Sequence, residues 1–296
     1  MKWSKWLKDD TKGANEKLGL FAIYCWRFGW KQGHRGNKYS TIQLKLASVR
    51  WYHRRHRDKV LVTSPSMELL LRGIKRMSDP VLKKQPVTPA FLRLLYRRLD
   101  FARPHDRLLW GSVLLGYFFL LRRSEFLRIG SQRTAYCLKT SDAFFSNPEG
   151  VRTTYGSASS VTIGLAGSKN DQYGRCAWRT MHVSGDALLC PRRALRHLLL
   201  ARRALGCGTH PYLCAELKAE EVAQDFKDLA ASIGVPKRNY STHSIRIGGA
   251  TSLSSGAADS LSIKLLGRWM NDCFGEYPVQ TAKSTVGLSS KMVVTN

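Results

Sequence analysis

Apolar and polar positions along the chain predict helices over most of its length and one short region of strands. Residues 18–30 are apolar with few breaks, and residues 41–55 place apolar side chains among many basic ones. Alternating apolar positions at 161–165 and 176–183 flank a polar, glycine-bearing segment, residues 167–174, which predicts a β-hairpin. We therefore expect a mainly α-helical protein with a small antiparallel β-sheet, an α+β fold.

The second half of the chain contains further helical stretches with clear ends. Residues 110–121 form a twelve-residue uncharged apolar run, which is typical of a buried core helix and much shorter than the roughly 20 residues that span a bilayer. We expect a basic amphipathic helix at 191–205 and another helix at 216–233, because a glycine follows each of them. Residues 242–277 predict two short helices.

A segment with three prolines and little apolar periodicity, residues 80–89, is expected to link two domains. At its end Thr88 and Pro89 predict the start of a helix, with the threonine as N-cap and the proline in the first turn. A length of 296 residues also favours two domains over one. We expect a small basic helical domain at 1–79 and a larger domain at 90–296.

The charge of the chain implies a polyanionic partner. Lysine and arginine total 48 against 21 acidic residues, which gives a formal net charge of +27. This self-repulsion favours nucleic acid as the partner, although charge alone does not choose between DNA and RNA. The N-terminus lacks the long apolar stretch and cleavage site of a secretory signal, so we expect an intracellular protein without membrane contact.

The seven cysteines are scattered and include no CxxC pair, which predicts free thiols. Cys207, His210 and Cys214 lie close together in the sequence, but no fourth ligand follows at a zinc-like spacing. We therefore expect neither a metal site nor a cofactor.

Two basic segments are candidates for contact with DNA phosphates. Residues 50–57 mix aromatic side chains with cations, which suits phosphate contact, although a solvated basic face explains the same pattern. The expected linker adds two adjacent lysines. The residues expected to bind DNA are Arg50, Arg54, Arg55, Lys83 and Lys84.

The larger domain contains the parts of a metal-free phosphodiester transfer, which needs a nucleophile, cations for the phosphate oxygens and an acid for the leaving oxygen. Arg122 precedes Glu125 by three residues at the expected end of the apolar helix, close enough for the carboxylate to orient the guanidinium. His243 and Arg246 lie one helical turn apart and are followed by two glycines that permit close approach of a backbone. Either pair taken alone is common in helices.

A lysine and a tyrosine complete this set. Lys169 lies in the expected hairpin turn, where its flexible stem can bring the ammonium group to a leaving oxygen. Tyr277 follows Arg246 by 31 residues. Most turn lysines are merely solvated, and a single tyrosine proves nothing. The functional prediction therefore depends on the occurrence of all these segments together.

In this order the segments resemble the tyrosine recombinases: R-x-x-E from Arg122, a hairpin lysine at Lys169, H-x-x-R-x-G-G-A-T from His243, and L-G-x-W shortly before Tyr277. The helical first third and the lysine- and proline-containing linker are similar to that family's core-binding domain and linker, so the resemblance covers nearly the whole chain. The segments at 167–171 and around Gly267-Arg268-Trp269 look closer to Crypton-type recombinases of eukaryotic mobile elements than to bacterial Xer or phage integrases.

The resemblance implies a site-specific recombinase or integrase that cleaves and rejoins DNA through a 3′-phosphotyrosyl intermediate, with neither ATP nor metal. Tyr277 would be the nucleophile and Lys169 the general acid. His243 would handle the tyrosine proton or hold a phosphate oxygen, and the two arginines would stabilise the transition state. The implied catalytic residues are Arg122, Lys169, His243, Arg246, Trp269 and Tyr277, with Glu125 and Arg268 in support.

One position of the implied set has two candidates. The family usually has a histidine or tryptophan nine residues before the tyrosine, where this chain has Arg268, whereas Trp269 lies eight residues before it. The indole N–H of Trp269 favours the tryptophan, since it can donate to a phosphate oxygen, and a clamp by Arg268 is the alternative.

By the same resemblance the partner is double-stranded DNA held by a homotetramer, in the nucleus of a eukaryote or beside the nucleoid in the cytoplasm of a bacterium. Two alternatives stay open: strand relaxation like that of a type IB topoisomerase, and a non-catalytic DNA-binding protein derived from a recombinase. An RNA-binding protein is more distant, because the sequence contains no aromatic RNA-stacking motif.

Overall fold

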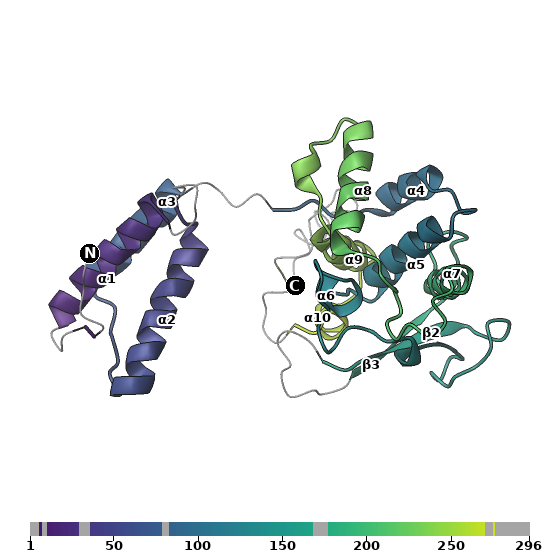
Figure 1. The fold of residues 1–296 in the computed structure, drawn as a ribbon, viewed down its shortest axis with the longest axis horizontal. Helices are drawn as coiled ribbons and strands as arrows, with labels where there is room; N and C mark the ends of the chain where they lie inside the picture. Colours follow the sequence, from purple (N-terminus) through teal and green to yellow (C-terminus); the bar gives the residue numbers. More distant parts are fainter. Residues whose placement is uncertain are drawn as a thin grey trace, which may run out of the picture. The chain divides into compact units, whose positions relative to one another are not determined.

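The computed structural model describes residues 6–7, 11–29, 36–78, 83–167, 177–269 and 275. The chain divides into two compact units, residues 1–82 and 83–296, each of which is described by itself. The expected mainly helical fold with a small antiparallel sheet is confirmed (Figure 1). None of the helices in the described ranges is long and apolar enough to cross a membrane.

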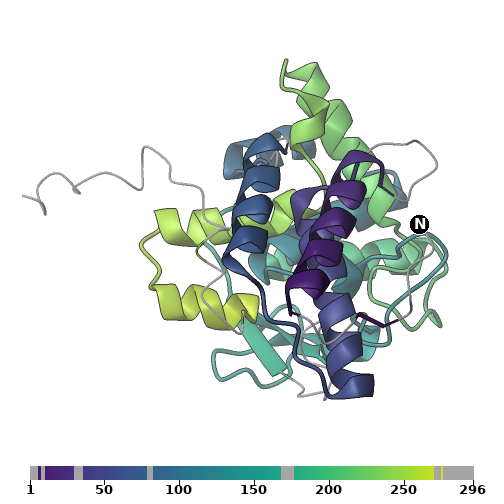
Figure 2. The ribbon, with the colours of Figure 1, turned by 90° about the vertical axis from the view of Figure 1, so that its left-hand side faces the viewer.

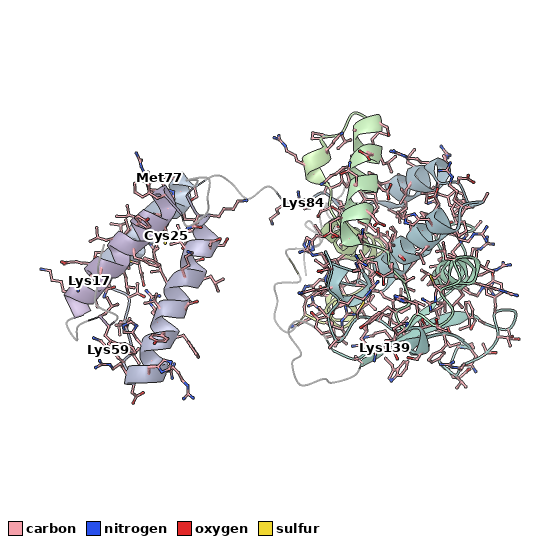
Figure 3. All side chains as sticks on the ribbon, in the orientation of Figure 1. Lys17, Cys25, Lys59, Met77, Lys84 and Lys139 are labelled. Carbon is pink, nitrogen blue, oxygen red and sulfur yellow. The ribbon has the colours of Figure 1, made fainter. Side chains whose placement is uncertain are left out.

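Three helices form the first unit: α1 (Thr11–Arg27), α2 (Tyr39–Arg57) and α3 (Pro65–Met77). Their apolar faces enclose a core that includes Leu18, Ile42 and Ile74, together with Cys25, which lies between the helices in Figure 3. Two of the helices match the expected stretches, with α1 beginning and ending earlier than expected. Helix α3 was not predicted, although its start carries a regular signal: the Ser64 hydroxyl accepts a hydrogen bond from the backbone N–H of the third helical residue at 3.2 Å.

The connecting segment, residues 83–88, belongs to the second unit. Its backbone N–H groups at Gln85 and Val87 donate to the carbonyls of Asn239 and Ser244 at 2.8 and 3.0 Å. A Cβ atom on Gly248 would lie 2.1 Å from the Val87 oxygen, so only glycine permits this approach. Residues 83–88, which fall within the expected linker at 80–89, are therefore fixed to the larger unit by backbone hydrogen bonds.

The core of the second unit is built on α5 (Pro104–Phe118), whose residues from Leu108 to Tyr117 are all buried. The helices α4 (Pro89–Arg98) and α7 (Pro191–Ala204) complete this layer, and α7 packs along α5. The predicted start of α4 is confirmed, because the Thr88 hydroxyl accepts from the Phe91 N–H at 3.1 Å. Both α4 and α7 begin with a proline in the first turn.

A three-stranded antiparallel sheet lies against α7. Its order is β1 (Ala143–Ser146), β2 (Ser160–Leu165) and β3 (Ala177–His182), with Phe145 opposite Val161 and Val161 opposite Met181. The expected hairpin is confirmed as β2 and β3. Strand β1 was not expected, because its four residues show too short an alternation.

The remaining helices cover the core. They are the short α6 (Arg123–Phe126), α8 (Ala219–Ser232), α9 (His243–Ser255) and α10 (Ser260–Gly267), with 3-10 turns at Thr140–Asp142 and Lys237–Asn239. The two short helices predicted near the C-terminal end are α9 and α10, which pack against each other and lie one above the other in Figure 2. In Figure 1, α6, α9 and α10 lie together on one side of the second unit and α7 lies on the other.

Candidate active site

Three segments that are distant in the sequence meet beside α6, α9 and α10. They carry Arg122 and Glu125, then Arg246, then Arg268 and Trp269. All five residues are predicted from the sequence to belong to one site, and the structure brings the five side chains together.

The first pair, Arg122 and Glu125, is held by the start of α6 and not by the end of the apolar helix. That helix, α5, ends at Phe118, and Leu120 takes the left-handed conformation with φ of 49°. Arg122 therefore precedes α6, and its backbone N–H donates to Glu125 Oε2 at 2.8 Å while Nη1 donates to Oε1 at 2.9 Å. The expected contact is present, but the expectation that both residues lie at the end of one helix was wrong.

Glu125 is fully buried, and a buried carboxylate needs opposite charges and hydrogen-bond donors. Arg268 supplies a second cation, since its Nη2 donates to Glu125 Oε2 at 2.5 Å. Burial lowers the pKa of Arg268, the charge of Glu125 opposes this, and repulsion from Arg122 adds to the lowering. The side chain of Arg268 thus neutralises a carboxylate inside the protein.

Arg246 is held on the other side of the cluster. Only 1% of it is exposed, and its Nη1 and Nη2 donate to the carbonyls of Leu120 and Gly267. Its guanidinium carbon lies 4.1 Å from the centroid of the Trp269 ring, a cation–π contact. The α10 helix ends with Arg268 at φ of 56°, and this turn brings Trp269 beneath Arg246.

The glycine before this turn is required by the packing. A Cβ atom on Gly267 would lie 1.6 Å from the indole ring of Trp269, closer than any side chain allows. Arg268 and Trp269 therefore do different things in the structure: Arg268 contacts Glu125, and Trp269 packs on Arg246. From the sequence alone the two residues are alternatives for one position.

His243 is the first residue of α9, one turn before Arg246, as expected from the spacing. Partial loss of hydration lowers the pKa of its imidazole, and the positive charges of Arg246 and Arg123 lower it further. The exposed ring is therefore held in the neutral form at pH 7, in which one nitrogen can accept a proton.

Lys169 and Tyr277 lie outside the described residues. A residue that was not expected, Arg179 on β3, links the hairpin to this region: its Nη2 donates to the carbonyl of Leu265 in α10 at 3.3 Å. The strand after the segment that contains Lys169 therefore starts beside the arginine cluster. A lone strand arginine gave no sequence signal for this contact.

The residues expected to bind DNA are placed in different ways. Arg54 and Arg55 are exposed on α2, and with Trp51 they line an open cavity of about 500 Å³ in the first unit, whereas Arg50 on the same helix is partly buried. Lys83 is exposed. Lys84, labelled in Figure 3, donates through Nζ to the Arg238 carbonyl at 2.5 Å, so it helps to fix the connecting segment.

The candidate metal ligands Cys214 and His210 have contacts that do not involve a metal. Cys214 is fully buried, which raises its pKa to about 12, and His210 Nε2 lies 2.7 Å from Glu216 Oε1. In the ranges that the structure describes, no three His, Cys, Asp or Glu side chains are grouped to hold a metal ion.

No protein-family profile matches the sequence, and no curated protein matches it. Solved structures do match the fold. The XerH site-specific recombinase, bound to its palindromic difH substrate in a post-cleavage complex, aligns with a TM-score of 0.56 at 12% identity over 96% of this chain and 70% of that one.

Two further structures give similar alignments. The Tn1549 transposon integrase in complex with circular intermediate DNA has a TM-score of 0.53 at 12% identity, over 95% of this chain and 85% of that one. A lambda integrase dimer bound to a COC′ core site has a TM-score of 0.50 at 14% identity, over 92% and 65%. The chain therefore has the fold of the tyrosine recombinases and integrases, and the match extends over both of its compact units.

Proposed function

We propose that the chain is a site-specific DNA recombinase or integrase that cuts and rejoins DNA through a phosphotyrosyl intermediate. The observation that carries the proposal is the meeting of Arg122 and Arg246 in one cluster within this fold. The cluster contains three guanidinium groups and one carboxylate, which leaves an excess of two positive charges. Such an excess suits a phosphodiester whose charge increases in the transition state.

In the proposed reaction the Tyr277 hydroxyl attacks the scissile phosphorus and the bond to the 5′ oxygen breaks. His243 is the candidate acceptor for the tyrosine proton, because its ring is held neutral. Lys169 gives a proton to the departing 5′ oxygen, which becomes a hydroxyl. Attack of a 5′ hydroxyl on the phosphotyrosine then restores the DNA strand and frees the tyrosine.

The supporting residues have separate tasks in this proposal. Glu125 accepts one hydrogen bond from the Arg122 backbone N–H and one from Nη1, and the second of these orients the guanidinium for a phosphate. Trp269 supports Arg246 from below. Glu125 and Arg268 are positioning residues, because their contacts are with each other and with Arg122.

The partner in this proposal is double-stranded DNA, bound by the basic surfaces of both units, including Arg54 and Arg55. We propose that residues 1–79 form a core-binding domain and residues 90–296 a catalytic domain. Backbone hydrogen bonds fix residues 83–88 to the catalytic domain. Recombination between two sites would use a homotetramer. We also propose the Crypton-type subfamily, a mobile-element origin and an intracellular site of action, nuclear in a eukaryotic host.

The test uses the full chain and its Tyr277→Phe variant on DNA duplexes nicked near several candidate sites, followed by denaturing electrophoresis. The substitution removes only the hydroxyl, so DNA binding is retained and supplies the control. We expect a covalent protein–DNA band with the unchanged chain and none with the variant.

Other outcomes separate the alternatives. Tight DNA binding by the unchanged chain without a covalent band at any site would contradict catalysis and favour a non-catalytic DNA-binding protein. A covalent band together with relaxation of supercoiled DNA, but no exchange between DNA molecules, would favour the topoisomerase alternative.

A further inference from the structure

A second cluster of cations lies on the opposite side of the larger unit, at the start of α7. Arg192, Arg193 and Arg196 occupy the first turns of this helix. Figure 1 shows α7 on the side of the unit away from α6 and α10, which hold the candidate active site. The proposed cleavage reaction therefore makes no use of these three arginines.

Two of the arginines are held by one aromatic ring. The guanidinium carbons of Arg192 and Arg196 lie 5.0 and 4.6 Å from the centroid of the Tyr155 ring. Arg196 Nη1 also donates to the Tyr155 hydroxyl at 3.2 Å, and Arg192 Nη1 donates to the Ala158 carbonyl at 2.7 Å. These contacts order the two side chains before any ligand arrives, which reduces the entropy lost on binding.

The arginine cluster borders an open cavity of about 500 Å³, lined by Arg192, Arg193, Ser159 and Ala187 among others. Two polar atoms there, the Arg192 Nε and the Ser159 Oγ, are buried without a protein partner in the described part of the chain. Both are groups that donate hydrogen bonds. Positive charge therefore borders the cavity, and two of its lining residues carry buried donors without a protein partner in the described ranges.

Negative charge from the protein does not balance the cluster. In the described ranges, no carboxylate lies within ion-pair distance of Arg192, Arg193 or Arg196. The cavity also contains Asp186, but its carboxylate accepts from the N–H groups of Leu188 and Leu189 and forms an ion pair with Arg93.

The positive potential also acts on a neighbouring histidine. The pKa of His197, on the same helix, is lowered to about 4 by burial and then by the charges of Arg107, Arg196 and Arg193. The part of the lowering that comes from Arg196 and Arg193 is what uncompensated cations produce on a nearby base. It agrees with the geometry of the cluster.

We propose that Arg192, Arg193 and Arg196, ordered by Tyr155, form a second DNA-binding surface that takes the phosphate backbone of a duplex segment outside the active site. Guanidinium groups match phosphate oxygens in geometry as well as charge, and backbone contact requires no particular base sequence. The surface binds DNA whether or not the chain cleaves it.

The first experiment places a photo-crosslinking p-benzoylphenylalanine at Ala187, which is exposed and lines the cavity. A matched control carries it at Gly208, just beyond the other end of α7, where a Cβ atom would meet nothing within 4 Å. The full chain is irradiated with a labelled duplex of mixed sequence. We expect a DNA crosslink at position 187, a much weaker one at position 208, and loss of the first in a chain that also carries Arg192→Gln, Arg193→Gln and Arg196→Gln.

A second experiment measures the dependence of DNA affinity on salt. Each phosphate contact contributes about 0.9 to the slope of log K against log salt, so the triple variant should lower the slope by roughly 2 to 3. The control triple Arg97→Gln, Arg98→Gln and Arg203→Gln removes the same charge from exposed positions outside the cluster and should change the slope much less.

No crosslink at position 187, an equal crosslink at position 208, or equal slopes for the two triple variants would overturn the proposal. The outcome is separable from that of the cleavage reaction. A crosslink at position 187 without a covalent Tyr277 band would support this surface and contradict the proposed cleavage activity. A covalent band without a crosslink at position 187 would support the activity and contradict the surface.

Discussion

The carboxylate of Glu125 is the point at which the cluster is most sensitive to a small change. Glu125→Gln keeps the size and shape of the side chain but removes its charge. Oε2 accepts from both the Arg122 N–H and Arg268 Nη2, so an amide NH₂ in that place would set donor against donor. Two guanidinium groups would then remain near each other without a counter-charge.

The expected loss in free energy of unfolding follows from the burial of the three charged side chains. The side chains of Glu125, Arg268 and Arg122 are 0%, 10% and 19% exposed, so water screens their charges little and the figure for a surface ion pair does not apply. Removing one partner of a buried pair costs about 3 to 5 kcal/mol. Since glutamine can still accept through its remaining oxygen, we expect about 3 kcal/mol, which in a unit of this length lowers Tm by roughly 6 to 12 °C.

The assay is thermal unfolding of the full chain, followed by near-ultraviolet circular dichroism and calorimetry. Glu149→Gln is the matched control, because it removes the same charge from an exposed position. A fall in Tm no larger than that of the control would refute the view that Glu125 balances the two arginines.

A double-mutant comparison tests the same contact from the other side. Arg268→Met removes one of the two cations that Glu125 neutralises. Because the two side chains are in direct contact, the combined variant should lose less stability than the sum of the two single variants. Additive losses would mean that the ion pair contributes no coupling energy.

Two further predictions concern packing and pH. Gly248→Ala places a methyl group 2.1 Å from the Val87 oxygen and should cost about 1 to 3 kcal/mol in urea unfolding, whereas Gly208→Ala meets nothing and should be neutral; equal effects would contradict the close approach. The folded-state pKa of His197, about 4, lies below its ordinary value of 6.5, so the unfolded chain takes up a proton first and stability is lost as the pH falls from about 6.5 to about 4. Because the ring is partly exposed and solvent screens its charge, we expect a loss of roughly 1 to 2 kcal/mol. His197→Phe should remove this part of the pH dependence, and an unchanged profile would count against it.

Local signals in the sequence were sufficient for several elements. Thr88 and Pro89 carry a regular helix start, and the structure has the predicted capping hydrogen bond. The alternation of β2 and β3 is long enough to be read, whereas the four residues of β1 are too few. The end of α5 was misjudged, because the apolar run continues through Leu121 although the helix ends at Phe118.

In the candidate site, too, contacts between residues close in the sequence could be predicted, whereas contacts between distant residues could not. The spacing of Arg122 and Glu125 predicts their contact, but the left-handed Leu120 that changes its geometry leaves no mark in the sequence. The pairing of Arg268 with Glu125 joins residues 143 positions apart, and no local pattern encodes it. Only the three-dimensional structure shows that Arg268 contacts Glu125 whereas Trp269 packs on Arg246.

The backbone bonds of the connecting segment have a mechanical consequence. Along the connecting segment, the Gln85 N–H donates to the Asn239 carbonyl, and the Val87 N–H then donates to the carbonyl of Ser244 in the first turn of α9, with the Val87 carbonyl against Gly248. A pull on this segment would therefore act on the 3-10 turn at Lys237–Asn239 and on the first turn of the helix that carries His243 and Arg246. A force applied at the N-terminal end of the second unit would thus reach the candidate phosphate-binding helix through a backbone hydrogen bond.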